Sequence, residues 1–481
     1  MQLPKPDDRI LTRKDAIVAR LREALGPGAV IERPAELLAY ECDALSAYRC
    51  PPLAVVLPST TEEVAAALRV CAEEGAPVVP RGAGTSLAGG SMPTSDAVVI
   101  GVSRLTKVLE ISTADRLVRV ETGRTNLSVT GAVEGQGFFY APDPSSQLAC
   151  AIAGNIAMNS GGAHCLKYGV TTNNLLGVKM VLMDGSIVEL DATGETGALD
   201  LLSLVCGSEG QLGIVTEATL RILPKPEGAG PVLIGFDSAE TAGACVAGII
   251  KAGVLPVAIE FMDAPCIRAC EAHAKAGYPD CAALLIVEVE GAPAEIAHQL
   301  GLIREIAERH DPVAFREAAG PEEAARIWLG RKSAFGAMGQ LGDYICLDGT
   351  IPVTELPRVL TRIGELSESY GLGCANVFHA GDGNMHPLIM FDANAPGGLE
   401  KAEAMGADIL NLCVEVGGCL TGEHGVGIEK RDLMESQFAA EDLEAQMQVK
   451  DVFDPEWLLN PAKVFPLALS EARRLRARPA A

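Results

Sequence analysis

Residues 77–90 read Pro-Val-Val-Pro-Arg-Gly-Ala-Gly-Thr-Ser-Leu-Ala-Gly-Gly, a short apolar run followed by a glycine-rich loop. The run predicts a strand. The four glycines of the loop let backbone N–H groups approach a phosphate without interference from a Cβ. The hydroxyls of Thr85 and Ser86 add further donors. The stretch therefore predicts a site for the pyrophosphate of a dinucleotide, with a glycine hairpin that binds no ligand as the alternative.

The segments next to this loop extend it into a larger unit. Residues 53–57 predict an apolar strand, and residues 60–63 (Thr-Thr-Glu-Glu) have the capping-box spacing of a helix that Gly75 would end. The predicted order is strand, helix, strand and loop. A Rossmann fingerprint is excluded, because Leu87 stands where the third glycine belongs and residues 91–93 (Ser-Met-Pro) open no helix.

Composition and charge narrow the class of protein. The chain has 481 residues, 48% of them hydrophobic and 21% charged, which indicates a globular protein of more than one domain. Its 39 Lys and Arg against 63 Asp and Glu give a formal net charge of −24, which makes nucleic acid an unsuitable partner. No apolar run predicts a membrane span, and the N-terminus lacks the order of a secretory signal, so we expect a cytoplasmic protein.

The cysteines do not form a recognisable cluster. The 14 cysteines are scattered without a Cys-x-x-Cys pair, and Cys266 and Cys270 come closest to one. We interpret them as reduced and mostly buried. Any iron–sulfur centre that the chemistry requires must therefore lie in another subunit.

The remaining pattern predicts an α+β protein. A Pro- and Gly-rich stretch at 224–231 marks a domain boundary. The division expected is a helical lead-in (1–52), a first domain (53–225), an α+β second domain (226–398) and a C-terminal helical region (399–481). Within these segments we expect a hairpin at 178–190 around Asp184-Gly185, strands at 97–101, 117–121, 254–261 and 283–289, and helices at 14–25, 292–309, 353–370 and 399–416.

Three of the seven histidines lie in two short stretches, His379-Ala-Gly-Asp-Gly-Asn-Met-His386 and Gly422-Glu-His-Gly425. The glycines of the first stretch would fold it back and bring its two imidazoles together, while Glu423 offers a carboxylate. Two His and one Glu bind Zn²⁺ or a similar divalent ion and leave a position open for substrate. His424 is a candidate base near neutral pH. Ordinary turn histidines are the alternative.

Two weaker features accompany these stretches. Residues 153–162 are rich in glycine and amide side chains, and Asn155 and Asn159 would share one side of a helical turn, where they could bind a planar heterocycle. Helix capping and turn chemistry are slightly favoured instead. Arg331 is a candidate clamp for a substrate carboxylate because its planar fork pairs bidentately, with a surface arginine as the alternative.

Taken in order along the chain, these motifs resemble the FAD-binding oxidase family with the vanillyl-alcohol-oxidase or p-cresol-methylhydroxylase (PCMH) type of flavin fold. The resemblance is to the branch of D-lactate dehydrogenases, D-2-hydroxyglutarate dehydrogenases and the FAD subunit of glycolate oxidase, and most closely to the last. It covers roughly residues 50–465 and includes residues 207–214 (Gly-Ser-Glu-Gly-Gln-Leu-Gly-Ile) and 459–461 (Leu-Asn-Pro).

The resemblance implies a PCMH-type FAD-binding domain of two α+β subdomains, an α+β cap domain for the substrate, and a C-terminal helical region that completes the flavin site. It implies non-covalent FAD, because the first glycine loop lacks the histidine that members with covalent FAD often carry there. It assigns His379, His386 and Glu423 to a divalent metal, with Zn²⁺ favoured over Mn and Fe, His424 to proton abstraction and Arg331 to the substrate carboxylate. The residues that it implies for FAD are Pro80, Arg81, Gly82, Gly84, Thr85, Ser86, Pro142, Asp143, Ser146, Gly154, Asn155, Asn159, Gly162, Tyr168, Gly169, Gly213, Ile214 and Asn460.

The implied reaction is the oxidation of a small 2-hydroxy acid, glycolate or D-lactate, to the 2-oxo acid, with hydride transfer to flavin N5. The hydroxyglutarate enzymes carry a lysine where this chain has Cys346 and an asparagine where it has Leu388. Groups that would hold a second carboxylate are thus missing, so a dicarboxylic substrate is disfavoured. D-2-Hydroxyglutarate or another D-2-hydroxy acid is the alternative substrate. A non-redox enzyme like alkylglycerone-phosphate synthase and a non-catalytic flavin-holding subunit are more remote alternatives.

The resemblance also implies partner subunits that accept the electrons from the reduced flavin. These are iron–sulfur and second flavin-type subunits that pass electrons to the respiratory chain. Such partners could attach a cytoplasmic protein to a membrane.

Overall fold

The computed structural model describes residues 2–191 and 199–477. Contacts divide the chain into two compact units. The first unit holds Met1–Gly161, Val170–Lys225 and His424–Ala481, and the second holds Gly162–Gly169 and Pro226–Glu423. Each unit is therefore assembled from segments that are far apart in the sequence.

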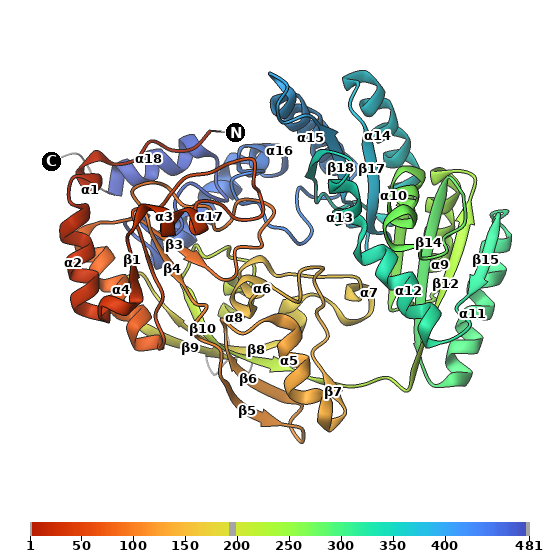
Figure 1. Cartoon of the computed structure of the whole chain (residues 1–481), viewed down its shortest axis with the longest axis horizontal. Helices are drawn as coiled ribbons and strands as arrows, with labels where there is room; N and C mark the ends of the chain where they lie inside the picture. The colour runs from red at the N-terminus through yellow and green to blue at the C-terminus, as the bar shows by residue number, and fades with distance from the viewer. Residues whose placement is uncertain (1, 192–198, 478–481) are drawn as a thin grey trace. The chain divides into compact units, whose positions relative to one another are not determined.

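The glycine-rich loop leaves a four-stranded sheet of the first unit, ordered β1-β2-β4-β3. Strands β1, β3 and β4 of this sheet are labelled in Figure 1. Its strands are β1 (Val30–Ile31), β2 (Ala54–Val56), β3 (Val78–Arg81) and β4 (Val98–Gly101), of which β2, β4 and β3 run parallel. Helix α4 (Thr61–Glu74) connects β2 to β3 and packs against α2 (Lys14–Leu25). The predicted order of strand, helix, strand and loop is confirmed.

The ends of α4 follow the predicted chemistry with one difference. The Thr60 hydroxyl accepts a hydrogen bond from the Glu63 N–H at 3.1 Å, and Gly75 ends the helix in the left-handed conformation (φ +64°). The Glu63 carboxylate reaches the N–H of Ser59 at 2.6 Å, one residue before the position that a strict capping box uses.

A five-stranded antiparallel sheet completes the strand layers of the first unit, in the order β5-β6-β10-β8-β9. The predicted hairpin at 178–190 is confirmed, because Val181 pairs with Ile187 across a turn in which Gly185 has φ +81°. Buried residues of three helices share a core with this sheet. The elements are β5 (Val108–Ser112), β6 (Leu117–Glu121), β8 (Leu175–Val181), β9 (Ile187–Asp191), β10 (Ile214–Arg221), α5 (Asn126–Val133), α6 (Ile152–Met158) and α8 (Leu201–Val205), with β7 (Phe138–Phe139) and β11 (Leu223–Pro224) as a separate pair.

The C-terminal part of the chain returns to the glycine-loop sheet. The N–H of Val78 in β3 donates to Leu458 O at 2.8 Å, and the N–H of Asn460 donates to Val78 O at 2.7 Å. Residues 458–460 thus lie beside Val78, the first residue of β3. The helices around this segment are α16 (Met434–Gln437), α17 (Ala440–Phe453) and α18 (Leu467–Ala477).

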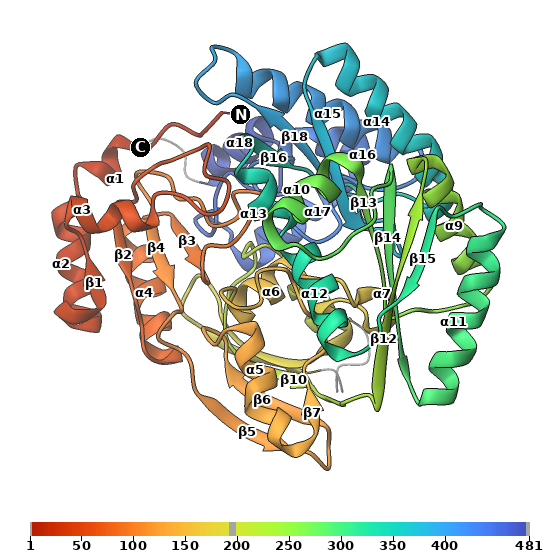
Figure 2. The same cartoon turned by 45° about the vertical axis from the view of Figure 1, so that its right-hand side comes forward.

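The second unit is built on a seven-stranded antiparallel sheet in the order β15-β12-β14-β13-β17-β18-β16. Helices α9, α11, α14 and α15 contact one another and the sheet, and α10, α12 and α13 form a second contacting group (Figure 2). The strands are β12 (Gly228–Phe236), β13 (Ala258–Asp263), β14 (Ala283–Gly291), β15 (Ala314–Glu317), β16 (Asp343–Cys346), β17 (Cys374–His379) and β18 (Pro387–Phe391). The helices are α9 (Ala239–Lys251), α10 (Ala264–Ala274), α11 (Pro293–Glu308), α12 (Pro321–Lys332), α13 (Ala334–Gly339), α14 (Leu356–Tyr370) and α15 (Gly398–Glu415).

Two predicted boundaries in this unit differ from the structure. The strand expected at 254–261 begins at Ala258, after Pro256, which has no N–H for a sheet ladder. The helix expected at 353–370 starts with a 3₁₀ turn at Val353–Glu355 and becomes α-helical at Leu356. The sulfurs of Cys266 and Cys270 on α10 are 3.9 Å apart, well beyond the ~2.0 Å of a disulfide.

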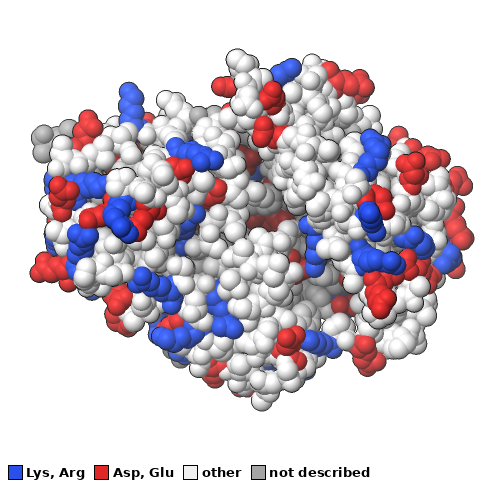
Figure 3. All heavy atoms as spheres, viewed as in Figure 1, with Lys and Arg blue, Asp and Glu red and all other residues white. Residues whose placement is uncertain are grey.

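Two further features concern the charged surface and the apolar character of the helices. Figure 3 shows basic and acidic side chains interspersed over one face of the molecule. None of the helices in the described part of the chain is long and apolar enough to span a lipid bilayer.

Candidate functional site

The two histidines and the glutamate predicted to bind metal lie together in the second unit. Glu423 Oε1 is 3.4 Å from His379 Nε2 and 3.1 Å from His386 Nε2. The three ligand atoms all lie within 4.8 Å of one another, and the two rings are nearly perpendicular with their centres 5.2 Å apart. Two ligands at ~2.1 Å from a tetrahedral ion are themselves ~3.4 Å apart, so this donor set fits a small divalent ion.

A tight turn between β17 and β18 brings the two histidines together. His379 is the last residue of β17, and His386 precedes β18. Gly383 has φ +75°, and a Cβ there would come within 2.1 Å of Ile351 O, so the turn requires glycine. The N–H of Asn384 donates to His379 O and to a carboxylate oxygen of Asp382, each at 3.2 Å. The turn therefore holds the two imidazoles at a short fixed separation.

The second ring nitrogen of each histidine has its own partner. His379 Nδ1 lies 2.6 Å from Glu260 Oε1, and His386 Nδ1 lies 3.2 Å from the main-chain oxygen of Leu347. Metal-binding histidines in proteins usually donate this second N–H to a carboxylate or a carbonyl, which fixes the tautomer and the ring orientation. Both rings thus direct Nε2 toward Glu423.

The loop that carries Glu423 is fixed by a buried carboxylate. Asp348 accepts hydrogen bonds from the N–H of Gly422 at 3.0 Å and of Glu423 at 3.1 Å, and from the Thr421 hydroxyl. Asp348 has no exposed surface. The main chain at Glu423 is therefore held by Asp348 and not through the Glu423 side chain.

The electrostatics of the three groups favour an ionised carboxylate between imidazoles. Burial alone would raise the pKa of the Glu423 carboxyl, but hydrogen bonds from His379 and His386 lower that pKa well below its usual range. Burial alone would lower the pKa of His379, but Glu260 and Glu423 together raise that pKa well above the usual range. The site thus stabilises positive charge next to Glu423, as a cation-binding site must.

Arg331 lies inside the second unit. Only 4% of this residue is exposed, so the alternative of a surface arginine is wrong. Its Nε donates to Glu260 Oε2 at 2.8 Å, and its Nη2 forms an ion pair with the same oxygen at 2.6 Å. Arg331, Glu260 and His379 therefore form one continuous chain of contacts.

The sequence pattern did not single out Glu260. The only local signal was an acidic residue inside the apolar strand sequence Ala-Ile-Glu-Phe-Met at 258–262. Its role became visible only from the register of β13 with β17, in which Glu260 lies directly opposite His379.

His424, the candidate base, follows Glu423 directly and opens the last segment of the first unit. Gly425 after it has φ +83°, and a Cβ there would come within 2.7 Å of Met158 Sδ. The glycine therefore allows the close main-chain path on the C-terminal side of His424.

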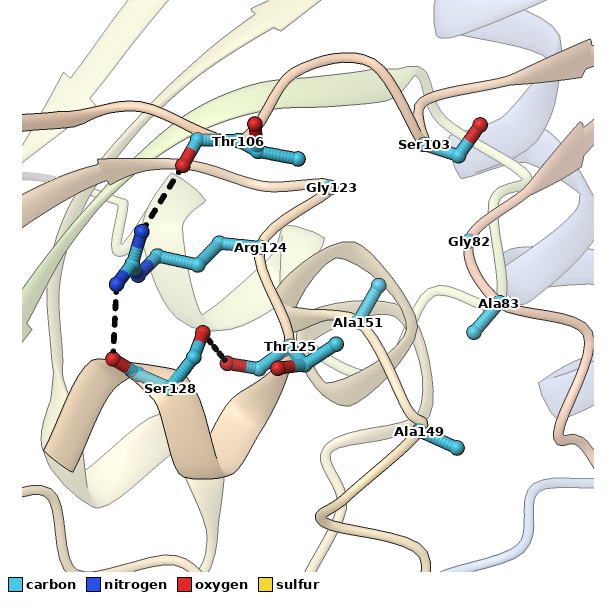
Figure 4. A pocket seen from close by; sticks show the side chains of 10 residues that line it. All are labelled: Gly82, Ala83, Ser103, Thr106, Gly123, Arg124, Thr125, Ser128, Ala149 and Ala151. Atoms are coloured by element: carbon cyan, nitrogen blue, oxygen red, sulfur yellow. Dashed lines mark hydrogen bonds between the residues drawn. The ribbon is translucent and has the colours of Figure 1, made fainter. Parts of the chain in front are cut away.

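The glycine-rich loop of the first unit borders a pocket of about 370 Å³ (Figure 4). A Cβ at Gly82 would approach the N–H of Gly154 to 3.3 Å, so two of the predicted cofactor glycines are neighbours. Gly123 also requires its glycine, because a Cβ would reach Val102 O at 1.9 Å. The pocket is lined by Gly82, Ala83, Ser103, Thr106, Gly123, Arg124, Thr125, Ser128, Ala149 and Ala151.

Most of this lining was not predicted from sequence. Arg124 spans one wall, with Nη1 donating to Thr106 O at 3.1 Å and Nη2 to Ser128 O at 3.0 Å (Figure 4). Gly123 and Arg124 come two and three residues after the end of strand β6, so a glycine close to the end of a predicted strand was the signal that could have found them.

Asn460 is the predicted cofactor residue with the clearest fit to a ligand. Its Nδ2 donates to Gly90 O at 3.0 Å and to Glu209 O at 2.7 Å, and only 1% of the residue is exposed. Its Oδ1 is buried and makes no hydrogen bond within the described residues. A buried acceptor of this kind, beside the end of the glycine loop, fits an N–H group of a bound cofactor.

Asn155 and Asn159 support the structural interpretation of their amides. Asn155 Oδ1 accepts from Asn126 Nδ2 at 3.0 Å. Asn159 ends helix α6 with φ +50° and accepts from the N–H of Thr172 at 2.9 Å. Asn155 thus contacts a side chain of the protein, and Asn159 contacts its main chain, which is consistent with the capping and turn alternative.

Several other residues predicted to bind the cofactor make contacts within the protein itself. Ser86 Oγ accepts from the N–H of Gly90 at 3.1 Å and closes the glycine loop, and Arg81 Nη1 donates to Cys42 O at 2.9 Å. Pro142 O accepts from Asn126 Nδ2, and Ile214 belongs to the buried core. Three predicted residues, Gly162, Tyr168 and Gly169, lie in the second unit, where the Tyr168 hydroxyl donates to Glu290.

Comparison with known proteins agrees with this fold. A family model described as "FAD binding domain" matches residues 52–191, and one described as "FAD linked oxidases, C-terminal domain" matches residues 225–464. The chain belongs to the FAD-linked oxidase family, and FAD is its cofactor. The solved structure of p-cresol methylhydroxylase has a TM-score of 0.78 at 16% identity and covers 95% of this chain and 98% of its own. The predicted α+β fold with a PCMH-type FAD-binding domain is confirmed.

Two relatives define the branch of the family. The chain is 46% identical over 457 residues to the glycolate oxidase subunit GlcD of Escherichia coli (strain K12), covering 94% of this chain and 91% of the relative. It is 30% identical over 431 residues to a D-lactate dehydrogenase of Anaerostipes hadrus, covering 86% and 89%. The predicted resemblance to this branch is confirmed.

Proposed function

We propose that this protein oxidises a small 2-hydroxy acid, glycolate or D-lactate, to the corresponding 2-oxo acid. FAD-dependent oxidation of a CH–OH group is the reaction that its family membership and its relatives support. The observation that carries the proposal is the convergence of His379, His386 and Glu423 around one point in the second unit. A scaffold that only held flavin would not need three converging metal ligands in this arrangement.

Each group of residues in the site has a separate proposed role. His379, His386 and Glu423 would hold a divalent ion, Zn²⁺ by preference, whose contribution is to lower the pKa of a bound hydroxyl. Bound FAD supplies the hydride acceptor, with Asn460 and the glycine loop among the residues that would hold it. His424 takes the proton from the 2-hydroxyl, and Arg331 orients the substrate carboxylate.

Two residues support a monocarboxylic substrate. Cys346 and Leu388 pair directly across β16 and β18, and both are buried, with Cys346 at 7% and Leu388 at 0% exposure. Neither side chain can neutralise a carboxylate. A second carboxylate held against them would be buried without a partner, which is costly. D-2-Hydroxyglutarate is therefore expected to be a poor substrate.

Anaerobic mixing with candidate acids tests the proposal. Glycolate or D-lactate is expected to bleach the yellow absorbance of the oxidised flavin, whereas L-lactate and D-2-hydroxyglutarate should do so far more slowly. Bleaching by none of these acids would contradict the proposed reaction. That result would favour the non-redox or the non-catalytic alternative.

The FAD is proposed to be non-covalent. Residues 81–84 of the glycine loop, Arg-Gly-Ala-Gly, contain no histidine that could form a link to the flavin. Acid precipitation of the purified protein is therefore expected to release all of the flavin into the supernatant, as measured by its absorbance. Yellow colour that stays with the washed precipitate would show a covalent bond.

Electron transfer partners belong to the same proposal. The relative of 46% identity is named as a subunit of glycolate oxidase. We propose that this chain likewise works with iron–sulfur and second flavin-type subunits, which take the electrons onward to the respiratory chain. The chain would then be a cytoplasmic protein that meets the membrane through these subunits.

A further inference from the structure

We infer that Glu260 is a positioning residue that fixes the orientation of His379 for metal binding, and that Arg331 holds the Glu260 carboxylate in the position this requires. The inference rests on the proposed metal role of His379. It gives Glu260 a function that acts through another residue, and it gives Arg331 a task besides the proposed contact with substrate.

The register of the sheet places the two groups face to face. Glu260 in β13 and His379 in β17 are direct partners in an antiparallel pair, so their side chains leave the same face of the sheet. The resulting contact joins Glu260 Oε1 to His379 Nδ1 at 2.6 Å. A proton on Nδ1 leaves the lone pair of the neutral imidazole on Nε2, the atom that faces Glu423 at 3.4 Å.

Arg331 neutralises the buried Glu260 carboxylate. Glu260 has no exposed surface, and a buried carboxylate without a partner would be strongly destabilising. The guanidinium of Arg331 contacts Oε2 through Nε at 2.8 Å and through Nη2 at 2.6 Å. Burial alone would raise the pKa of the Glu260 carboxyl, but Arg331 and His379 lower that pKa below its usual value. Oε2 of Glu260 thus contacts the arginine, and Oε1 contacts the imidazole.

The two strands do not depend on Glu260 to stay together. Phe261 and Phe378, which are also direct partners in this register, stack with ring centres 4.7 Å apart. Neighbouring side chains of a strand point to opposite faces, so this stack lies on the other side of the sheet from Glu260 and His379. A purely structural role for Glu260 is therefore the weaker explanation of its burial, and substitutions there should leave the strand pair intact.

The test measures metal affinity directly. Purified protein is stripped with a chelator, dialysed, and titrated with Zn²⁺ against a chromophoric competitor, without substrate. Removing the carboxylate partner of a metal-binding histidine typically weakens metal binding about 10- to 100-fold. We expect Glu260→Ala at the upper end of this range, and Glu260→Gln at the lower end because the amide oxygen can still accept from Nδ1.

A matched control comes from the same sheet. Glu288 in β14 is also buried and also contacts a histidine, with Oε2 lying 3.1 Å from His164 Nε2, but it has no contact with the metal site in the described residues. Glu288→Gln is expected to keep the Zn²⁺ affinity of the wild type. Spectra of the Co²⁺-loaded proteins add a readout of ligand geometry, and they should change for Glu260→Gln and not for Glu288→Gln.

Loss of Glu260 leaves Arg331 buried without its partner, so a double variant protects the test against misfolding. Glu260→Gln with Arg331→Met removes both charges and should fold with a melting temperature near that of the wild type, yet bind Zn²⁺ as weakly as Glu260→Gln alone. Arg331→Met alone should also weaken Zn²⁺ binding if the arginine acts through Glu260.

The outcomes separate this inference from the proposed function. Wild-type Zn²⁺ affinity in folded Glu260→Ala and in the double variant would overturn the inference and leave the proposed function intact. A wild-type protein that binds no stoichiometric metal would instead overturn the metal site and this inference with it. If Zn²⁺ binds and weakens as expected while no 2-hydroxy acid bleaches the flavin, the inference stands and the proposed substrate is wrong.

Discussion

Replacement of Glu423 with Gln is expected to abolish stoichiometric binding of a divalent metal and to slow substrate-driven flavin reduction about 10³-fold. A single oxygen of Glu423 faces both imidazoles, at 3.4 Å from His379 Nε2 and 3.1 Å from His386 Nε2. The substitution removes the negative charge of the ligand set and leaves an amide oxygen, a far weaker metal ligand, between the two imidazoles. A Lewis-acidic ion contributes several kcal/mol to the transition state, and each ~1.4 kcal/mol corresponds to a tenfold change in rate.

Metal content per chain and anaerobic stopped-flow absorbance measure the two parts of this expectation. The main-chain hydrogen bonds from Gly422 and Glu423 to Asp348 do not involve the Glu423 side chain, so the loop should keep its path in the variant. Glu288→Gln, which changes a buried glutamate of the same unit, serves as the control. Wild-type metal content and affinity in Glu423→Gln would show that the three residues are not the metal site.

Replacement of His424 with Ala is expected to lower the rate of flavin reduction by about 10² to 10⁴, the range in which a positioned base contributes. Metal binding should be retained, because His424 is not one of the three converging ligands. This combination distinguishes the variant from Glu423→Gln, which loses both properties. A single-turnover experiment under anaerobic conditions isolates the reductive step from the later transfer of electrons to partners.

The control for this variant is His298→Ala, which removes an exposed histidine from helix α11. Its reduction rate should equal that of the wild type. Partial recovery of His424→Ala by added imidazole would support a proton-transfer role. An unchanged rate without imidazole would remove His424 from the mechanism.

The local features of the fold could be predicted because each depends on residues that are close in sequence. The Thr60 cap, the left-handed Gly75 and the hairpin around Asp184-Gly185 all came out as expected. Each is held by hydrogen bonds over a few residues and by backbone preferences of individual amino acids. The turn from His379 to His386 belongs to this group, because its glycines signal the reversal that brings the two rings together.

Other features could not be read from local pattern. The sequence slightly favoured capping over cofactor binding for the amides of Asn155 and Asn159, but it could not name their partners. These partners, Asn126 and Thr172, lie 29 and 13 residues away along the chain. Ser103 and Arg124 line the pocket only because separate loops of the first unit meet there. Periodicity along one segment carries no information about such meetings.

The ordered motifs of the sequence predicted an α+β FAD protein of the 2-hydroxy-acid branch through their resemblance to that family. Ligand chemistry and the glycine turn were enough to name His379, His386 and Glu423 as candidate partners, because residue type and turn preference are local properties. The sequence could not show that Glu260 stands opposite His379 or that Arg331 neutralises it. Those contacts join positions 119 and 71 residues apart. They follow from strand register and helix packing, which depend on the sum of many weak long-range contacts and not on any one segment.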